Sequence, residues 1–123
     1  KDELQLIQRK LQDINAVIAT DPQDDNMKKL KLISTLDIEE IEQIEKRIIE
    51  DCNIEARFVL PGSDSSIEGA YLDLARSIAR KAERQVVKFN KNNNRSDLIN
   101  IICYLNRLSD LLFIMARSKD SKE

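Results

Sequence analysis

The sequence predicts an all-α protein, a bundle of four helices joined by short loops. Apolar residues recur every three or four positions over most of the 123 residues, which is the period of an amphipathic helix. The chain has only two glycines and two prolines, too few for the many tight turns of a sandwich or a barrel. Charged residues make up 34% and hydrophobic residues 41%, a composition typical of one helical domain with charged outer faces.

The first helix is predicted from Glu3 to Ala19. Pro22 follows it closely, and proline cannot continue the helical hydrogen-bond ladder. Residues 21–34 are polar and rich in lysine, so we expect a loop or a mobile connection there. The apolar stripe of this helix consists of Leu4, Ile7, Leu11, Ile14 and Ile18.

The second helix is predicted to begin at Asp37, which would cap it together with Glu40 in a capping box. The alternating Glu and Lys residues that follow form a solvated face. The buried stripe is expected to be Ile38, Ile41, Ile44, Ile48 and Cys52.

The third helix is predicted over residues 66–90, a turn over 90–94, and the fourth helix from Ser96 to about Arg117. The fourth helix is apolar over nearly its whole circumference, so it is either central or part of a subunit interface. The core face of the third helix is expected to carry Ala70, Tyr71, Leu74, Ala75, Ile78, Ala79, Ala82 and Val86.

Residues 53–66 form an irregular segment with apolar content, including Phe58. Connections are usually polar, so this segment either plugs the end of the bundle or lines a pocket. The residues alone leave both alternatives open.

Charged residues share one flank of the third helix, beside its apolar face: Arg76, Arg80, Glu83 and Arg84. The flank could simply be solvated, with Arg–Glu pairs worth only tenths of a kcal/mol, and composition favours this interpretation. Alternatively it binds a polyanion, because arginine offers forked donors to phosphate oxygens.

The fourth helix carries a polar stripe in its apolar surface, formed by Asn106, Asp110, Phe113 and Arg117. Buried polar groups need partners, so the stripe makes either an interhelical hydrogen bond, a salt bridge to an arginine of the third helix, or a ligand pocket. The pattern thus indicates an anionic-ligand groove between the third and fourth helices, and it names no reaction.

Composition also argues against several classes of function. The chain has no histidine, which excludes imidazole bases and histidine metal ligands. Its net charge is -2, so we expect no nucleic-acid partner. No stretch approaches the roughly 20 apolar residues of a membrane span, and no signal peptide opens the chain. The two cysteines are read as free thiols in a reducing compartment, so we expect a cytoplasmic protein without a membrane partner.

Three segments, residues 75–84 (ARSIARKAER), 58–62 (FVLPG) and 104–110 (YLNRLSD), resemble motifs of the PduO-type ATP:corrinoid adenosyltransferase family. Residues 75–84 (ARSIARKAER) resemble its A-R-x-x-x-R-R-A-E-R signature, and residues 58–62 (FVLPG) its F-x-L-P-G-G loop. Residues 104–110 (YLNRLSD) resemble its (Y/F)-L-N-R-L-S-D run. Residues 7–20 are similar to the family's second helix, so the resemblance covers essentially the whole chain.

The resemblance implies a trimer of five-helix bundles that transfers the 5′-deoxyadenosyl group of ATP to cobalt(I) of a corrinoid, with Mg²⁺, releasing triphosphate. The product would be handed to a cobalamin-dependent enzyme. Phe58 and Arg80 would be the catalytic residues, and Arg76 would form an intersubunit ion pair. No protein metal ligand is implied. ATP would be bound by Arg80, Lys81, Glu83, Arg84 and Asn106, and the corrinoid by Phe58, Asp110 and Phe113.

The chain departs from the family pattern in several places. The family's N-terminal ATP loop, T-K-x-G-D-x-G-x-T, and its first helix have no counterpart here, so residues 1–123 are expected to be one helical-bundle domain without them. Lys81 replaces an arginine and loses bidentate geometry. Two further interpretations compete with the enzyme: a helical adaptor, and a corrinoid-binding chaperone without transferase activity.

Overall fold

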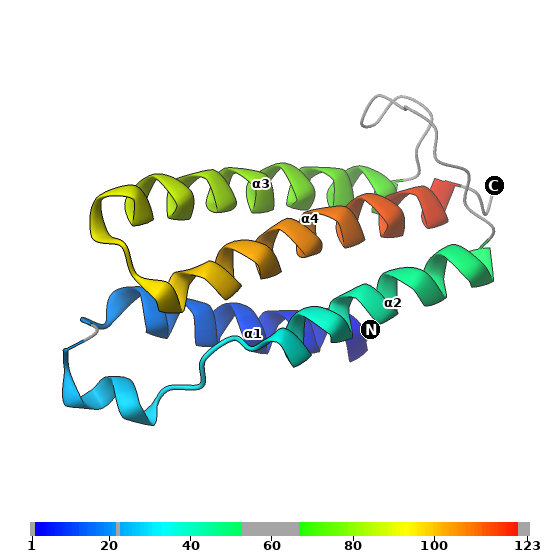
Figure 1. The fold of residues 1–123 in the computed structure, drawn as a ribbon. Coiled ribbons are helices and arrows are strands. Elements are labelled where there is room, and N and C mark those ends of the chain that lie inside the picture. Colours follow the sequence, from blue (N-terminus) through cyan, green and yellow to red (C-terminus); the bar gives the residue numbers. More distant parts are fainter. Residues whose placement is uncertain (1, 22, 53–66, 121–123) are drawn as a thin grey trace.

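The computed structural model describes residues 2–21, 23–52 and 67–120, and in this part the chain is an elongated all-α bundle without strands (Figure 1). The predicted fold class and the number of helices are confirmed. The helices are α1 (Asp2–Ala19), α2 (Thr35–Cys52), α3 (Ile67–Asn93) and α4 (Ile99–Asp120), and the 3₁₀ turns are η1 (Asp25–Lys29) and η2 (Ser96–Leu98).

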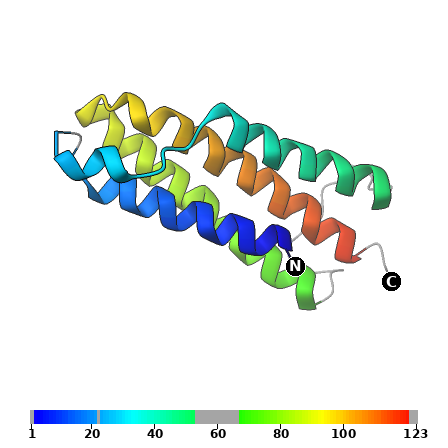
Figure 2. The same cartoon turned by 90° about the horizontal axis from the view of Figure 1, so that it is seen from below.

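Helix α4 is the central element, which is one of the two alternatives that its sequence left open. Figures 1 and 2 both place it beside α2 and α3, with which it makes its most extensive contacts. Tyr104 is only 1% exposed, and burial raises the pKa of its phenol above the ordinary value. The buried positions of the η2–α4 segment are Leu98, Ile101, Tyr104, Leu105, Leu108, Leu111, Leu112 and Ala116.

The same segment corrects one expectation. Residues 96–118 are long and apolar enough, by length and composition, to cross a membrane, whereas the sequence analysis found no stretch that approached this limit. The core helix of a globular bundle passes the same test, because burial on most sides also selects apolar residues. The central position of α4 therefore accounts for its composition.

The connection between α1 and α2 is more ordered than predicted. It contains η1, whose first turn is capped by Asp24 through a 2.8 Å hydrogen bond that Asn26 N donates to Asp24 Oδ1. Ile33 is 4% exposed and belongs to the core. In α1 itself Leu4 lies 40% exposed at the edge, while Val17, which the predicted stripe omits, is fully buried.

Helix α2 begins two residues earlier than predicted, at Thr35. Ser34 is its cap, because Asp37 N donates to Ser34 Oγ (3.4 Å) and Ser34 N donates to Asp37 Oδ2 (2.9 Å). Asp37 therefore completes the capping box and does not start it. Its other oxygen pairs with Lys10 Nζ of α1 at 2.8 Å. Burial alone would raise the pKa of Asp37, but the hydrogen bonds from Lys10 and Ser34 outweigh it and lower that pKa.

The predicted core face of α3 is confirmed only in part: Ala79 and Val86 are buried, and Ala75 and Ala82 pack against the core. Tyr71, Leu74 and Ile78, expected in the core, are 69%, 58% and 60% exposed. The residues that face α4 instead include Asp73, which is buried. This orientation has a physical reason, since Asp73 and Glu83 find partners on α4 in Arg117 and Asn106.

Helix α3 ends three residues later than predicted, in the left-handed conformation of Asn94 (φ 47°). Asn94 N donates to Asn90 O at 2.9 Å, a C-terminal closure for which asparagine is well suited.

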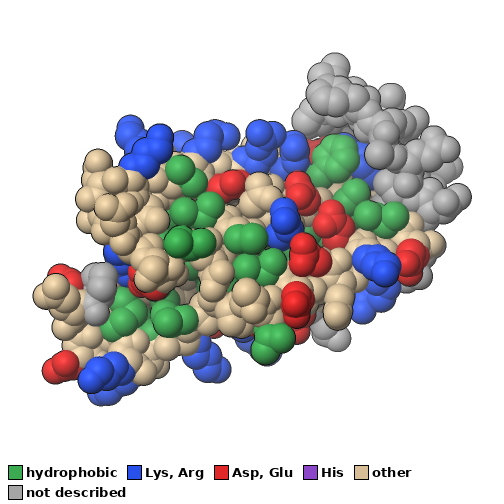
Figure 3. Space-filling model, viewed as in Figure 1, with side chains coloured by type: hydrophobic (Ala, Val, Ile, Leu, Met, Phe, Trp, Pro, Cys, Tyr) green, Lys and Arg blue, Asp and Glu red, His purple; other side chains and the backbone are tan. Residues whose placement is uncertain are grey.

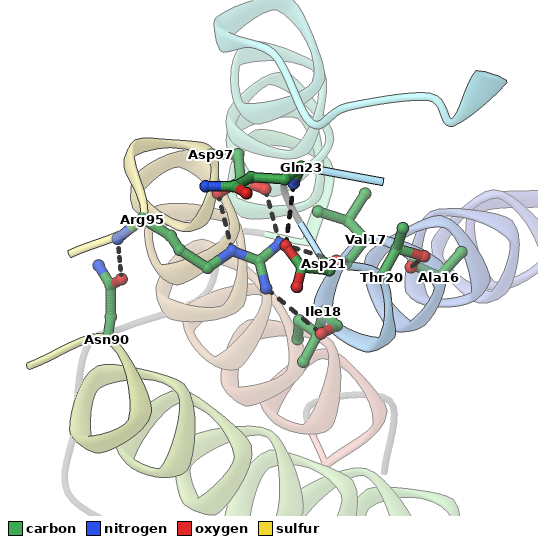
Figure 4. A network of polar contacts seen from close by, with 9 residues as sticks. All are labelled: Ala16, Val17, Ile18, Thr20, Asp21, Gln23, Asn90, Arg95 and Asp97. Atoms are coloured by element: carbon green, nitrogen blue, oxygen red, sulfur yellow. Dashed lines mark hydrogen bonds and ion pairs between the residues drawn. The ribbon is translucent and has the colours of Figure 1, made fainter. Parts of the chain in front are cut away.

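Arg95 then ties this connection to the end of α1, as Figure 4 shows. Its Nη2 donates to Val17 O (2.9 Å) and pairs with Asp97 Oδ2 (2.8 Å), and its Nη1 donates to Ile18 O (3.4 Å). Its Nε donates to Asp97 Oδ1, and its backbone N donates to Asn90 Oδ1. This group, Arg95 with Asp97, Asn90, Val17 and Ile18, is called the Arg95 cluster below. It places a cation on the last carbonyls of α1, where the helix dipole favours positive charge.

Candidate functional site

Helices α3 and α4 form an antiparallel hairpin whose facing polar residues meet in pairs (Figure 1). The pairs recur one or two helical turns apart, so the charged flank of α3 and the polar stripe of α4 stay in register along the bundle. The pairs are Asn106 Nδ2 to Glu83 Oε2 (3.3 Å), Arg76 Cζ to the Phe113 ring centroid (5.2 Å) and Arg117 Nη2 to Asp73 Oδ2 (2.6 Å).

A groove of about 320 Å³ lies between the two helices, which confirms the position predicted for it. Arg76, Arg80 and Arg84 stand at intervals of four residues on one face of α3, over about 12 Å of helix. Two carboxylates accompany the three guanidinium groups, so the lining carries a positive formal charge. Helix α3 contributes Arg76, Arg80, Glu83 and Arg84, and helix α4 contributes Asn106, Ser109 and Asp110; the groove defined by these residues is called the α3–α4 groove.

The arginines of the α3–α4 groove keep donors available. Arg80 and Arg84 are exposed and make no hydrogen bond or ion pair within the described residues. Arg76 is half-buried, and its Nε is enclosed without a hydrogen-bond partner in the same part of the chain. A buried donor without an acceptor is unfavourable, so an anion that reached Arg76 would be bound with a gain in free energy.

Asn106 is held by side chains of two helices. Its Nδ2 donates to Glu83, and its Oδ1 accepts a hydrogen bond from Arg107 Nη1 (2.8 Å). Arg107 Nε in turn donates to Glu42 Oε2 of α2 (3.0 Å). The interhelical hydrogen bond proposed for the polar stripe therefore exists, and the same amide also lines the α3–α4 groove.

Acidic groups lie at the α4 side of the groove. Asp110 is exposed there, and its negative charge acts on the carboxyl group of Glu45 in α2. Burial, and then the negative charge of Asp110, raise the pKa of Glu45, while Arg107 opposes the shift. Within residues 2–21, 23–52 and 67–120, no three acidic or cysteine side chains gather as a metal site would require. Figure 3 shows acidic side chains gathered on one face of the bundle, below the basic side chains along α3.

Some predicted residues fall elsewhere. Lys81 is exposed on α3 and does not line the groove. Phe113 is half-buried and does not line it either, but its ring contacts the Arg76 guanidinium. Phe58 lies outside the described residues, together with the whole apolar segment 53–66. In this part of the chain Arg76 makes no ion pair, so its predicted intersubunit pair stays a prediction.

Two residues of this region were not predicted from the sequence. Ser109 is buried and lines the groove, and its Oγ donates to Asn106 O one turn earlier. Asp73 is the partner of Arg117, whereas the salt bridge considered for the polar stripe was one from its carboxylate to an arginine of the third helix. Asp73 lies three residues before Arg76 and so on the same flank of α3, a spacing that identifies it in retrospect.

A second, apolar groove of about 340 Å³ lies between α1, α3 and α4. Leu4 and Leu11 of α1 line one side, and Ile78 with the alanines at 75, 79 and 82 lines the α3 side. Beside it, Tyr71 and Leu74 continue the exposed apolar face of α3.

Comparison with known proteins identifies relatives over the whole chain. Residues 1–119 match the model of a family described as cobalamin adenosyltransferase. The corrinoid adenosyltransferase PduO of Salmonella typhimurium is 32% identical over 118 residues, covering 96% of this chain and 34% of the relative. The corrinoid adenosyltransferase MMAB of Bos taurus is 33% identical over 124 residues, covering 99% of this chain and 50% of the relative. A corrinoid adenosyltransferase of Citrobacter freundii is 31% identical over 122 residues, covering 98% of this chain and 66% of the relative. The chain thus spans from about a third to two thirds of the length of these relatives.

Proposed function

The chain belongs to the cobalamin adenosyltransferase family, and we propose that it transfers the 5′-deoxyadenosyl group of ATP to cobalt(I) of a corrinoid. The observation that carries the proposal is the α3–α4 groove, in which Arg80 and Arg84 offer unpaired donors beside the enclosed Nε of Arg76. Phosphate oxygens are natural acceptors for such a row of guanidinium groups.

The proposed reaction is a nucleophilic displacement. An electron pair of cobalt(I) forms the bond to the 5′ carbon of ATP, the carbon–oxygen bond breaks, and its electron pair leaves with triphosphate. Cobalt(I) needs no base to activate it, which suits a chain without histidine. The protein's tasks are to align the two substrates, to stabilise the charge on the leaving triphosphate and to exclude water.

The groove residues divide these tasks for ATP. Arg80 and Arg84 would bind the triphosphate and stabilise its charge as it leaves, which makes Arg80 the catalytic arginine of the proposal. Asn106 is already oriented by Glu83 and Arg107, so its amide and the Glu83 carboxylate would meet the nucleoside end. Lys81 would add only long-range attraction, because it lies outside the groove.

Mg²⁺ would enter with the nucleotide. The ion commonly keeps phosphate and water ligands and needs only one or two carboxylates from the protein. Asp110 fits that role, because it lines the groove and is exposed. Bound there, Mg²⁺ would neutralise part of the triphosphate charge.

The corrinoid would lie at the Phe113 end of the groove, against Phe113, Phe58 and Asp110. Phe113 supports this assignment by its position behind Arg76, while Phe58 rests on the motif resemblance alone. Aromatic rings there would exclude water and the lower axial ligand from cobalt.

We also propose a homotrimer, in which Arg76 forms its ion pair across subunits. The exposed Tyr71, Leu74 and Ile78 and the adjoining apolar groove support an assembly that covers them. The protein would work in the cytoplasm and pass its product to a cobalamin-dependent enzyme.

An anaerobic titration of the full-length protein tests the function. With ATP, Mg²⁺ and reduced cobalamin, the absorption spectrum is expected to change to that of a cobalt–carbon product. Lys88→Ala, on an exposed position of α3 outside the groove, is the matched control for Arg80→Ala. Binding of both substrates without transfer would favour the chaperone, and binding of neither would favour the adaptor.

A further inference from the structure

The end of the α3–α4 hairpin beyond the groove holds a buried ion pair. Arg117 Nη2 lies 2.6 Å from Asp73 Oδ2, and the two side chains are 4% and 3% exposed. Neither residue lines the α3–α4 groove, and the proposed function gives neither a task. A buried pair of this kind is often no more stable than apolar residues of similar volume, so stability alone does not explain it.

The pair is connected to the groove through an aromatic ring. The guanidinium carbon of Arg117 lies 5.0 Å from the centroid of Phe113, and that of Arg76 lies 5.2 Å from the same centroid. These distances are within the range of cation–π attraction. Arg76 also lines the groove, so a continuous series of contacts runs from Asp73 through Arg117 and Phe113 to the ligand site.

Helix geometry places the four side chains of this series on the facing surfaces of α3 and α4. Asp73 and Arg76 are three residues apart on α3, and Phe113 and Arg117 are four residues apart on α4, so each pair shares one helix face. The four side chains meet across the interface as two adjacent contacts. Fixing the Arg117 guanidinium with a buried carboxylate therefore restricts the position of the Phe113 ring beside it.

We infer that Asp73 and Arg117 are positioning residues for the corrinoid half of the reaction. The carboxylate of Asp73 holds the Arg117 guanidinium against Phe113, and this contact keeps the ring in the orientation that receives the corrinoid. The inference rests on the proposed function. The series reaches the groove only at Arg76, and the proposed triphosphate ligands Arg80 and Arg84 lie outside it, so we expect ATP binding to depend on it less than corrinoid binding does.

The test replaces both charges together in the full-length protein, as Asp73→Leu with Arg117→Met. Removing one partner would leave an uncompensated buried charge, whereas the paired replacement keeps an apolar interface of similar volume. We expect the paired variant to fold, with kcat for adenosyl transfer at least tenfold lower or the corrinoid KM at least tenfold higher, and the ATP KM within twofold of wild type. The spectrum of bound cobalt(II) corrinoid should also shift toward the form that retains its lower ligand. Asp73→Glu, which keeps the carboxylate, should retain most of the activity.

A double-mutant cycle with Phe113→Leu asks whether the pair acts through the ring. If it does, the paired replacement should change kcat and corrinoid KM by less than twofold once Phe113 is leucine. Lys10→Met, which removes the interhelical ion pair with Asp37 away from the groove, is the control for a general loss of charge pairing.

The outcomes separate this inference from the proposed function. Wild-type protein that forms no cobalt–carbon bond would overturn the function itself. An active wild type whose paired variant has unchanged kinetics would overturn only the positioning role, as would equal losses of ATP and corrinoid affinity. If the paired variant does not fold, Phe113→Leu decides alone. Unchanged corrinoid kinetics in Phe113→Leu would mean that the ring does not receive the corrinoid, and this result would overturn the positioning role of the pair.

Discussion

The Arg95 cluster and the α3–α4 groove both set arginines between helices, and they use them in opposite ways. Arg95 donates from all three guanidinium nitrogens, to two carbonyl oxygens of α1 and to Asp97 (Figure 4). Arg80 and Arg84 make no such bonds within the described residues. An arginine whose three guanidinium nitrogens all donate within the protein stabilises the fold, whereas exposed arginines lined up along a groove remain available to an anion.

Burial explains how both arrangements are tolerated. The Arg95 side chain is only 8% exposed, so water has little access to it and the protein supplies most of its acceptors. Arg80 and Arg84 remain hydrated, and leaving them unpaired carries little folding penalty. We therefore expect mutations in the Arg95 cluster to change the stability of the fold, and mutations of Arg80 or Arg84 to change anion binding.

The largest expected effect is at Arg95. Arg95→Met should lower the free energy of unfolding by about 3 kcal/mol, because it leaves Asp97 without its cation and the end of α1 without its cap. Urea denaturation measures the loss. Adenosyl transfer per folded molecule should stay within twofold of wild type. A selective loss of transfer would contradict the assignment of Arg95 to stability alone.

Arg80→Ala should show the reverse behaviour. We expect ATP binding to weaken by about 1.5–3 kcal/mol, the usual value of a hydrogen bond to a charged group. The free energy of unfolding should change by less than about 0.5 kcal/mol, as is usual for a surface substitution. Calorimetry with the full-length protein measures the affinity, with Lys88→Ala as the control. Unchanged ATP affinity would mean that Arg80 binds no nucleotide and belongs to a solvated flank, the interpretation that composition alone favours.

The Lys10–Asp37 pair lies between these extremes, since both side chains are only partly exposed. Asp37→Asn should lower stability near neutral pH by about 1 kcal/mol, the upper range for an exposed pair. The folded-state pKa of Asp37 is lowered from its ordinary value of 3.8, so its contribution is present above that value and is lost as the pH falls through the lowered pKa. Urea titrations at several pH values should therefore show wild type and variant converging in acid. A difference that persists at the lowest pH would assign the effect to capping geometry and not to charge.

The smallest effect is expected at Lys81. Because it lies outside the α3–α4 groove, Lys81→Ala should change both ATP affinity and stability by less than about 0.5 kcal/mol. The same calorimetry compares it with Arg80→Ala. A loss equal to that of Arg80→Ala would mean that the nucleotide reaches beyond the groove.

Local sequence patterns predicted the parts of the molecule that depend on one helix at a time. The apolar stripe of α2 and the charged flank of α3 follow from helical period and residue chemistry alone, whereas the turn predicted over 90–94 is found only at its last residue, Asn94. The cap of α2 was within reach of the same reasoning, since Ser34 and Asp37 have the spacing of a capping box. The groove could be predicted because each of its walls lies on a single helix.

What the tertiary structure alone decided is how these surfaces meet. The sequence determined that α3 has an apolar face and a charged flank, but only its packing on α4 decided that Ala79 and Val86 are buried while Tyr71, Leu74 and Ile78 of the same face stay exposed. Likewise Arg117 required a partner, and Asp73 became that partner through the register of the hairpin. The physical reason is that a helix fixes the angles between its own side chains, whereas its rotation depends on which contacts satisfy its neighbour's polar groups.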